Sequence, residues 1–177
     1  MSQADVVTGN AETGAHILPL VPADVDELTA LAAAIWRHHY PDIISPAQIE
    51  YMLAQRYDAA VLRAELERHD LWWDQLRVGG RMTGFASYFL LPAGEMKLDK
   101  LYVHHALQRR GYGGMLLARA LDVARERGCG AMMLAVNKHN RNAIAAYRKH
   151  GFHIDSSVVK DIGGGFVMDD YLMVRKL

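Results

Sequence analysis

A glycine-rich segment with two arginines, Gln108–Gly114, joins an apolar stretch to an amphipathic one and limits the folds open to this chain. Residues 98–103 before it predict a buried strand, and apolar residues at helical spacing after it predict a helix that Gly128 ends. A loop of this kind presents unpaired backbone N–H groups at the positive end of the helix dipole. It therefore suits a phosphate or pyrophosphate, although a tight strand-to-helix turn with surface arginines fits the same residues equally well.

Two common phosphate-binding motifs do not fit this loop. A P-loop ends in Gly-Lys-Ser/Thr, whereas Gly114 is followed by Met115 and Leu116. The dinucleotide-binding fingerprint needs glycine or alanine three places after Gly113, where this chain has Leu116. Both classes of nucleotide-binding protein are therefore disfavoured.

Length and composition predict one globular domain over residues 15–177, preceded by a small, polar and disordered tail over residues 1–14. The 20 basic and 20 acidic residues cancel, so we expect neither nucleic acid nor a membrane surface as a partner. The single cysteine, Cys129, excludes an internal disulfide framework and fits a reducing compartment. With no apolar run of about 18 residues and no secretory signal pattern, the expected location is the cytoplasm.

The order of predicted elements indicates a mixed α/β (α+β) fold, a sheet with helices packed on it. Gly79-Gly80 between two apolar stretches is a strong hairpin signal. Strands are predicted at 16–20, 71–78, 82–90, 95–103, 131–136, 152–160 and 166–175, and helices at 23–39, 46–56, 59–68, after the glycine-rich loop, and at 140–150.

The strand over 95–103 changes phase. Met96 and Leu98 are apolar at even positions, but Leu101 and Val103 are apolar at odd ones. Because side chains alternate strictly along a strand, an extra residue near Asp99-Lys100, a β-bulge, would restore one buried face. A strand buried on both faces is the alternative.

A second polar constellation follows the strand over 131–136. Asn140 stands at the expected N-cap of the next helix, and Ala143 and Tyr147 share one face of it. The hydroxyl of Tyr147 can therefore point toward the carboxyl end of the neighbouring strand. A core tyrosine with only its hydroxyl in solvent is the competing interpretation.

Together these segments resemble the GCN5-related N-acetyltransferase (GNAT) family. Gln108–Gly113 matches the family signature Q/R-x-x-G-x-G/A, and the Asn-x-x-Ala-x-x-x-Tyr sequence with the later Gly151-Phe152 falls at the family's spacing. The element order agrees over about residues 16–177. The resemblance implies a mostly antiparallel sheet with a splayed pair of central parallel strands, and transfer of acetyl from acetyl-coenzyme A to a primary amine by direct attack.

The resemblance also implies roles for individual residues. The backbone of Arg109–Gly114 would hold the pyrophosphate, main-chain groups of residues 101–103 would pair with the pantetheine arm, and Tyr147 would be the general acid. No metal is implied. The implied coenzyme A contacts are Leu101, Tyr102, Val103, Gln108, Arg109, Arg110, Gly111, Tyr112, Gly113, Gly114, Asn140 and Tyr147.

The general base is less well determined. The family branch that acetylates ribosomal protein N-termini has a glutamate five residues before the asparagine, where this chain has Ala135, so that branch is disfavoured. Other branches place an acidic base on the pantetheine strand, which makes Asp99, with Glu95 second, the preferred candidates. His104, His105 and a water relay stay open, and both carboxylates could equally be solvated charges.

The acceptor pocket is expected near the first two helices. An aromatic and partly acidic set there suits a cationic amine such as a polyamine, through cation–π and charge contacts. Its members are Trp36, His38, His39, Tyr40, Asp42 and Tyr51, of which Trp36, His39 and Tyr40 are the expected acceptor contacts. Equally, Trp36 could belong to the core and His38-His39 to a solvated helix end.

Three other functions remain open: a non-catalytic coenzyme A sensor, an N-terminal or lysine protein acetyltransferase, and a nucleotide-phosphate binder. The expected partner is thus a small-molecule or protein amine, with a homodimer left open.

Overall fold

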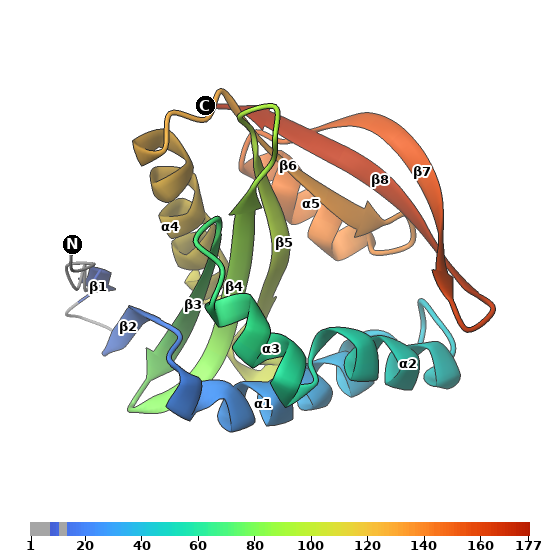
Figure 1. Cartoon of the computed structure of the whole chain (residues 1–177), viewed down its shortest axis with the longest axis horizontal. Coiled ribbons are helices and arrows are strands. Elements are labelled where there is room, and N and C mark those ends of the chain that lie inside the picture. Colours follow the sequence, from blue (N-terminus) through green and yellow to red (C-terminus); the bar gives the residue numbers. More distant parts are fainter. Residues whose placement is uncertain (1–7, 11–13) are drawn as a thin grey trace.

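The computed structural model describes residues 8–10 and 14–177, and this part of the chain forms one eight-stranded sheet (Figure 1). The strand order is β1-β2-β3-β4-β5-β6-β8-β7, and every neighbouring pair is antiparallel except β5 and β6. The expected mixed, mostly antiparallel sheet with one parallel pair is confirmed. The strands are β1 (Thr8–Asn10), β2 (Ala15–Pro19), β3 (Leu71–Val78), β4 (Arg81–Leu90), β5 (Met96–Val103), β6 (Ala131–Asn137), β7 (His153–Gly163) and β8 (Phe166–Lys176).

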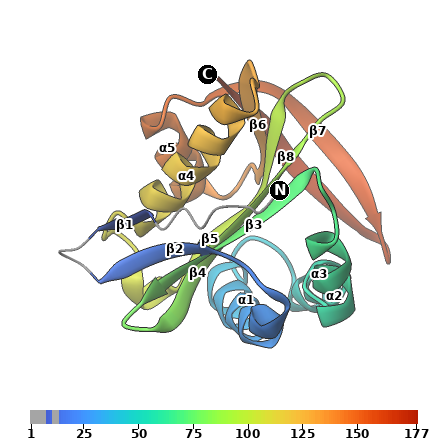
Figure 2. The same cartoon turned by 60° about the vertical axis from the view of Figure 1, so that its left-hand side comes forward.

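Helices cover both faces of the sheet. Figure 2 shows α4 and α5 on one side and α1, α2 and α3 on the other. None of these helices in the described ranges is both long and apolar enough to span a membrane. Their bounds are α1 (Val25–His39), α2 (Pro46–Arg56), α3 (Ala59–Leu66), α4 (Tyr112–Glu126) and α5 (Arg141–Lys149), with single 3₁₀ turns at Pro22–Asp24 and His105–Leu107.

The N-terminal tail departs from expectation at three residues. Thr8–Asn10 forms β1, which pairs with Ala15–Ile17 of β2. Backbone pairing can order a short polar segment that has no apolar periodicity for a sequence pattern to reveal. The rest of the expected tail, residues 1–7 and 11–13, lies outside the described residues.

Two apolar clusters form the core, one on each face of the sheet. The first lies under α4, whose Leu116, Leu117 and Ala120 are at most 2% exposed and face the sheet. The second lies under α1 and contains Leu28 and Trp36, both nearly inaccessible. The sheet therefore carries a buried layer on both sides, and a ligand can reach its centre only where neighbouring strands separate.

The β-bulge expected near Asp99-Lys100 is present. Ser87 of β4 pairs with Lys100 and Tyr88 pairs with Leu98, so Asp99 is the extra residue on β5. Met96 and Leu98 before the bulge, and Val103 after it, all belong to the cluster under α4. The phase change in the sequence thus had the predicted cause.

The parallel pair separates immediately beyond this bulge. Pairing between β5 and β6 covers only Met96–Leu98 against Met132–Leu134. Beyond the bulge residue Asp99, the remaining residues of β5, Lys100–Val103, are paired with β4 on one side alone. This is the splayed central pair that the resemblance implied.

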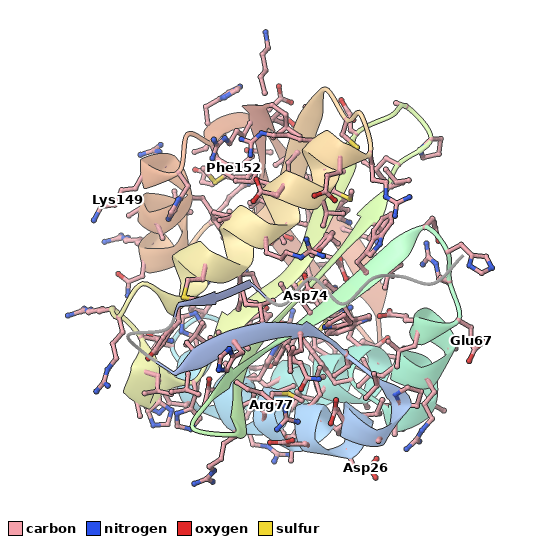
Figure 3. The ribbon with its side chains drawn as sticks, turned by 90° about the vertical axis from the view of Figure 1, so that its left-hand side faces the viewer. Asp26, Glu67, Asp74, Arg77, Lys149 and Phe152 are labelled. Carbon is pink, nitrogen blue, oxygen red and sulfur yellow. The ribbon has the colours of Figure 1, made fainter. Side chains whose placement is uncertain are left out.

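Arg77 of β3 fixes the start of α1 on the sheet (Figure 3). Its Nη2 lies 3.1 Å from Asp24 Oδ1 and 2.7 Å from Glu27 Oε2. Because the start of the 15-residue helix is held in this way, Trp36 and His39 at its C-terminal end lie at the opening between β5 and β6.

Close packing around Gly84 of β4 predicts a large stability loss for Gly84→Ala. An added Cβ would lie 2.8 Å from Tyr102 O and 3.3 Å from Val103 Cγ2, so the backbone must move. We expect the free energy of unfolding to fall by about 1–3 kcal/mol in urea denaturation. Gly130→Ala is the control: nothing lies within 4 Å of its Cβ position, so a change within about 0.5 kcal/mol is expected. Equal losses in both variants would contradict this packing argument.

Candidate active site

A cleft of about 1010 Å³ opens where β5 and β6 part. It continues from the start of α4, across the splayed strands, to the space between α1, α2 and the β7–β8 hairpin. Most residues expected to contact coenzyme A line it, namely Leu101, Tyr102, Val103, Gln108, Arg109, Gly111, Gly113, Gly114, Asn140 and Tyr147.

Two of the expected coenzyme A contacts do not line the cleft. The side chain of Tyr112 is 6% exposed and belongs to the core cluster under α4. Arg110 is exposed outside the lining. Tyr112 faces the sheet because it occupies the first helical turn at the same spacing as Leu116, four residues later.

The N-terminus of α4 presents unoccupied donors to the cleft. Gly111 is its N-cap residue at φ 84°, a left-handed conformation that glycine adopts without strain, and no side chain caps the first turn. The N–H groups of that turn have no partner within the helix. Gly113 and Gly114, which carry no side chains, border the cleft here. An anion can therefore approach the backbone closely at the positive end of the helix dipole.

The side chain of Gln108 and the backbone of Arg109 shape the loop before this helix. Gln108 Nε2 donates a hydrogen bond to Val103 O over 3.2 Å, which ties the loop to the end of β5. Arg109 is the one non-glycine residue with a positive φ, 62°, among the residues described. Such a conformation costs an ordinary residue of the order of 1 kcal/mol, and strain of this kind concentrates at ligand sites. Gln108 therefore positions the loop, a role that the sequence did not indicate.

Asn140 and Tyr147 approach the cleft from α5. Asn140 is the N-cap, as predicted, and its Oδ1 accepts a hydrogen bond from Ala143 N over 3.3 Å. The Tyr147 ring packs edge-on against Phe152 at 5.7 Å between centroids, and Figure 3 shows Phe152 beside α5. Burial raises the pKa of Tyr147 above its usual value of 10.0, so its hydroxyl keeps the proton at physiological pH.

The three residues expected to bind acceptor all line the cleft at the end of α1. Trp36 is also a core residue, 1% exposed, whose Nε1 donates to Tyr57 Oη over 3.2 Å. Tyr40 Oη and Tyr102 Oη are hydrogen-bonded at 2.9 Å, which joins α1 to β5. Burial lowers the pKa of His39, so its imidazole is neutral near pH 7.

Asp99 lies in the cleft but is a poor general base. Its Oδ2 is 2.7 Å from Arg56 Nη2 and 2.8 Å from Lys100 Nζ. Although burial opposes ionisation, these two cations hold the pKa of Asp99 well below its usual value. A carboxylate that binds protons so weakly accepts one from an amine with difficulty.

The other candidates for the base are outside the cleft lining. Glu95 precedes β5, where its carbonyl accepts a hydrogen bond from Leu91 N. His104 Nδ1 accepts from Ala106 N, and His105 stacks on His38 at 3.9 Å between centroids. A carboxylate that the sequence did not indicate, Asp170 of β8, does line the cleft.

The β7–β8 hairpin is held against α2 at the end of the cleft beside α1 and α2. Tyr51 Oη donates to Ile162 O over 2.7 Å, and Gln48 Nε2 donates to Val167 O over 2.8 Å. The turn at Gly164 packs against the ring of Tyr51. The cleft is thereby bounded on this side by the hairpin and α2 together.

Comparison with known sequences identifies the family. The model of the acetyltransferase (GNAT) family matches residues 27–152, which include the glycine-rich loop at 108–114, the splayed strands β5 and β6, and α5. This chain belongs to that family. Membership confirms the expected enzyme class, an acyl-coenzyme A-dependent N-acetyltransferase.

Individual relatives agree with this result. An uncharacterized N-acetyltransferase of Mycobacterium tuberculosis is 28% identical over 87% of this chain and 98% of its own length. The streptothricin acetyltransferase of Streptomyces lavendulae is 35% identical over 41% of this chain and 39% of its own length.

Among solved structures, PaiA N-acetyltransferase from Thermoplasma acidophilum, in complex with coenzyme A, has a TM-score of 0.80 at 23% identity, over 92% of this chain and 99% of its own. The ribosomal-protein-S18-alanine N-acetyltransferase of Escherichia coli has a TM-score of 0.70 at 21% identity, over 92% and 93%. At these identities the likeness concerns the fold.

Gly113→Asp is expected to separate cofactor binding from helix stability. Its Cβ position has room, 3.8 Å from the nearest side-chain atom, and a carboxylate in the first turn favours the helix dipole. The same charge repels a pyrophosphate, so we expect the Kd for coenzyme A to rise at least about tenfold, about 1.4 kcal/mol, in calorimetry. The midpoint of thermal unfolding should not fall, and Gly113→Ala should bind better than Gly113→Asp. Unchanged coenzyme A binding in Gly113→Asp would show that the anion lies elsewhere.

Asp99→Asn is expected to affect stability more than proton transfer. Removing the carboxylate leaves Arg56 without its partner and Lys100 with Glu65 alone, so we expect a loss of about 2 kcal/mol at pH 7. Because the folded-state pKa of Asp99 is lowered, this stabilisation is present above the usual carboxyl pKa and shrinks as pH falls through the folded-state value.

The control for this variant is Asp26→Asn, which removes the exposed ion pair with Arg63 and should cost less than about 0.5 kcal/mol. Urea denaturation at several pH values measures both. A stable Asp99→Asn protein would contradict the structural role of this carboxylate.

Proposed function

We propose that this enzyme transfers acetyl from acetyl-coenzyme A to the primary amine of a small cationic acceptor, by direct attack of the amine on the thioester. One observation carries the proposal: a single cleft joins the uncapped N-terminus of α4 to an acceptor pocket, with Tyr147 and the splayed strands between them. Bringing both substrates together in that cleft supplies much of the rate acceleration through proximity.

The residues at the α4 end of the cleft support acetyl-coenzyme A as the cosubstrate. The first-turn N–H groups of α4 and the side chain of Arg109 would hold the pyrophosphate. The free edge of β5 at Leu101–Val103 would pair with the amide groups of the pantetheine arm, since β6 has moved away. The coenzyme A complex of the PaiA enzyme, which shares this fold, adds support.

Tyr147 is proposed as the general acid. It lines the cleft and holds its proton at physiological pH because burial raises its pKa. Protonation of the departing thiolate makes it a better leaving group. Asn140, at the start of the same helix, would contact the pantetheine arm.

A small acceptor is favoured over a folded protein. The β7–β8 hairpin and α2, joined through Tyr51 and Gln48, restrict the approach of a large surface. Aromatic side chains at the end of α1, with Trp36 and Tyr40 among them, offer cation–π contact to an ammonium group. The name of the Streptomyces relative, a streptothricin acetyltransferase, also indicates a small-molecule acceptor for that protein. We propose the cytoplasm as the location, since the only cysteine is free and buried.

The decisive experiment measures thiol release from acetyl-coenzyme A with a panel of diamines, polyamines, aminoglycosides and lysine-containing peptides. Turnover with small polyamines above peptides would support the proposal. Turnover with peptides alone would favour a protein acetyltransferase instead. Tight coenzyme A binding with no turnover on any amine would indicate a sensor module. Protection against thermal unfolding by ATP but not by coenzyme A would contradict acetyl-coenzyme A as the donor.

Tyr147→Phe is expected to lower kcat by about 10²-fold or more while the Kd for acetyl-coenzyme A changes less than about twofold. Only the proton donor is removed, and the ring that packs on Phe152 is kept. Tyr171→Phe is the matched control, because Tyr171 lies outside the cleft lining. Steady-state kinetics and calorimetry check both variants. Full activity of Tyr147→Phe across the pH range would show that Tyr147 is not the general acid.

A further inference from the structure

Asp170 of β8 is a buried carboxylate with an unused oxygen. Its side chain is 8% exposed and lines the cleft. Among the residues that the structure describes, its Oδ1 has no hydrogen-bond partner. Burying an unpaired polar atom costs about 1–3 kcal/mol, so a position of this kind is retained at the expense of stability. An acceptor group entering the cleft would supply the missing partner.

The alternation of β8 directs Asp170 toward the acceptor. Met168, two residues earlier, belongs to the apolar cluster on the α1 side of the sheet, whereas Met173 belongs to the cluster on the α4 side. Side chains two apart share a face, so Asp170 faces α2, while Asp169 faces away and forms an ion pair with Lys138. Two adjacent aspartates therefore have different environments.

The register of the sheet places Asp170 beside the splay. It pairs with Asn137, the last residue of β6, and neighbouring strands are about 4.8 Å apart. Tyr147 reaches the same cleft from α5, on the opposite side of the sheet. The two side chains thus border the gap between β5 and β6 from opposite faces, one on the acceptor side and one on the donor side.

We infer that Asp170 is the general base of the transfer reaction and receives a proton from the acceptor ammonium group. This inference rests on the proposed function. It replaces Asp99, the base favoured by the sequence, whose Oδ2 is engaged by both Arg56 and Lys100.

The protons and bonds balance without another reagent. The protonated amine loses one proton to the Asp170 carboxylate, and its nitrogen pair forms the new C–N bond at the thioester carbonyl. The C–S bond breaks, and the Tyr147 hydroxyl protonates the leaving sulfur. The nitrogen loses a second proton, which restores Tyr147 through solvent, while Asp170 releases its proton to water. The products are the amide, the free thiol and one proton.

The electrostatic surroundings make Asp170 a better proton acceptor than Asp99. Burial, and next Asp169, raise the pKa of Asp170, while Arg56, Lys97 and Lys138 act in the opposite direction. A carboxyl with a raised pKa holds a transferred proton more firmly. The remaining ionisable groups that line the cleft include His39 and Tyr40 of α1, Lys160 and Asp161 of β7, and Tyr147 of α5.

The test compares Asp170→Asn, Asp170→Glu and Asp169→Asn with the wild type, using acetyl-coenzyme A and the best amine of the panel from pH 5.5 to 10. Asp169→Asn is the matched control, since it changes the neighbouring residue outside the cleft lining. Folding is checked by thermal unfolding. Because the folded-state pKa of Asp170 is raised, its charge disfavours the folded state above that value, so Asp170→Asn should unfold at pH 7 no earlier than the wild type.

The expected result is a kcat at pH 7 at least about 10²-fold lower for Asp170→Asn, with partial recovery at high pH where more amine is neutral. The acidic limb of the wild-type profile, which reflects protonation of Asp170, should be absent. Asp170→Glu should retain part of the activity. Asp169→Asn should keep the wild-type kcat on the plateau of the profile, with the acidic limb moved to lower pH because Asp169 helps to raise the pKa of Asp170. The Kd for coenzyme A should stay unchanged throughout.

Three outcomes would overturn the inference. If folded Asp170→Asn kept the wild-type pH profile and kcat, Asp170 would be excluded as the general base, while the proposed acetyltransferase function would stand. A raised KM with unchanged kcat would make Asp170 only a binding group. A wild-type protein that transfers acetyl to none of the amines would refute the proposed function itself, and the inference with it.

Discussion

The ion cluster around the bulge in β5 is the constraint on which the site depends. The extra residue, Asp99, turns two consecutive charged side chains toward α2 and α3, where Asp99 and Glu65 balance the charges of Arg56 and Lys100. Lys100 also lies 4.8 Å from the ring centroid of Trp73. An extra residue in a strand would normally be unfavourable, since it interrupts the ladder. Here the charges that it brings together hold the interruption in place.

This interruption creates the cleft. Beyond the bulge β5 continues beside β4 but no longer pairs with β6, so one edge of β5 is free in the middle of an otherwise continuous sheet. Both faces of the sheet are covered by apolar clusters, so this opening is where polar ligands can meet the backbone. The glycine-rich loop at Gly111 lies at one end of the cleft, and the contact of Tyr51 with the hairpin lies at the other.

Local features were predictable from the sequence because they depend on neighbouring residues. The phase change after Leu98 gave the bulge, Asn140 gave the helix cap, and Gly79-Gly80 gave the hairpin, in which both glycines have positive φ. Long-range pairing was not predictable. Arg56 meets Asp99 across 43 positions of the chain, and no local pattern indicates this contact, which with that of Lys100 outweighs burial and lowers the pKa of Asp99. Likewise, nothing local distinguishes Asp170 from Asp169; the sheet register and alternation do.

The turn at the tip of the β7–β8 hairpin limits how this enzyme can diversify. An added Cβ at Gly163 would come within 2.5 Å of Tyr51 Oη, and one at Gly164 within 2.8 Å of its ring. A side chain at Gly163 or Gly164 would therefore displace Tyr51 or lift this part of the hairpin from α2, which together bound the cleft here. Substitutions along the strands, such as at Met168, change the lining of the cleft without this clash, so they are the less costly way to alter its shape.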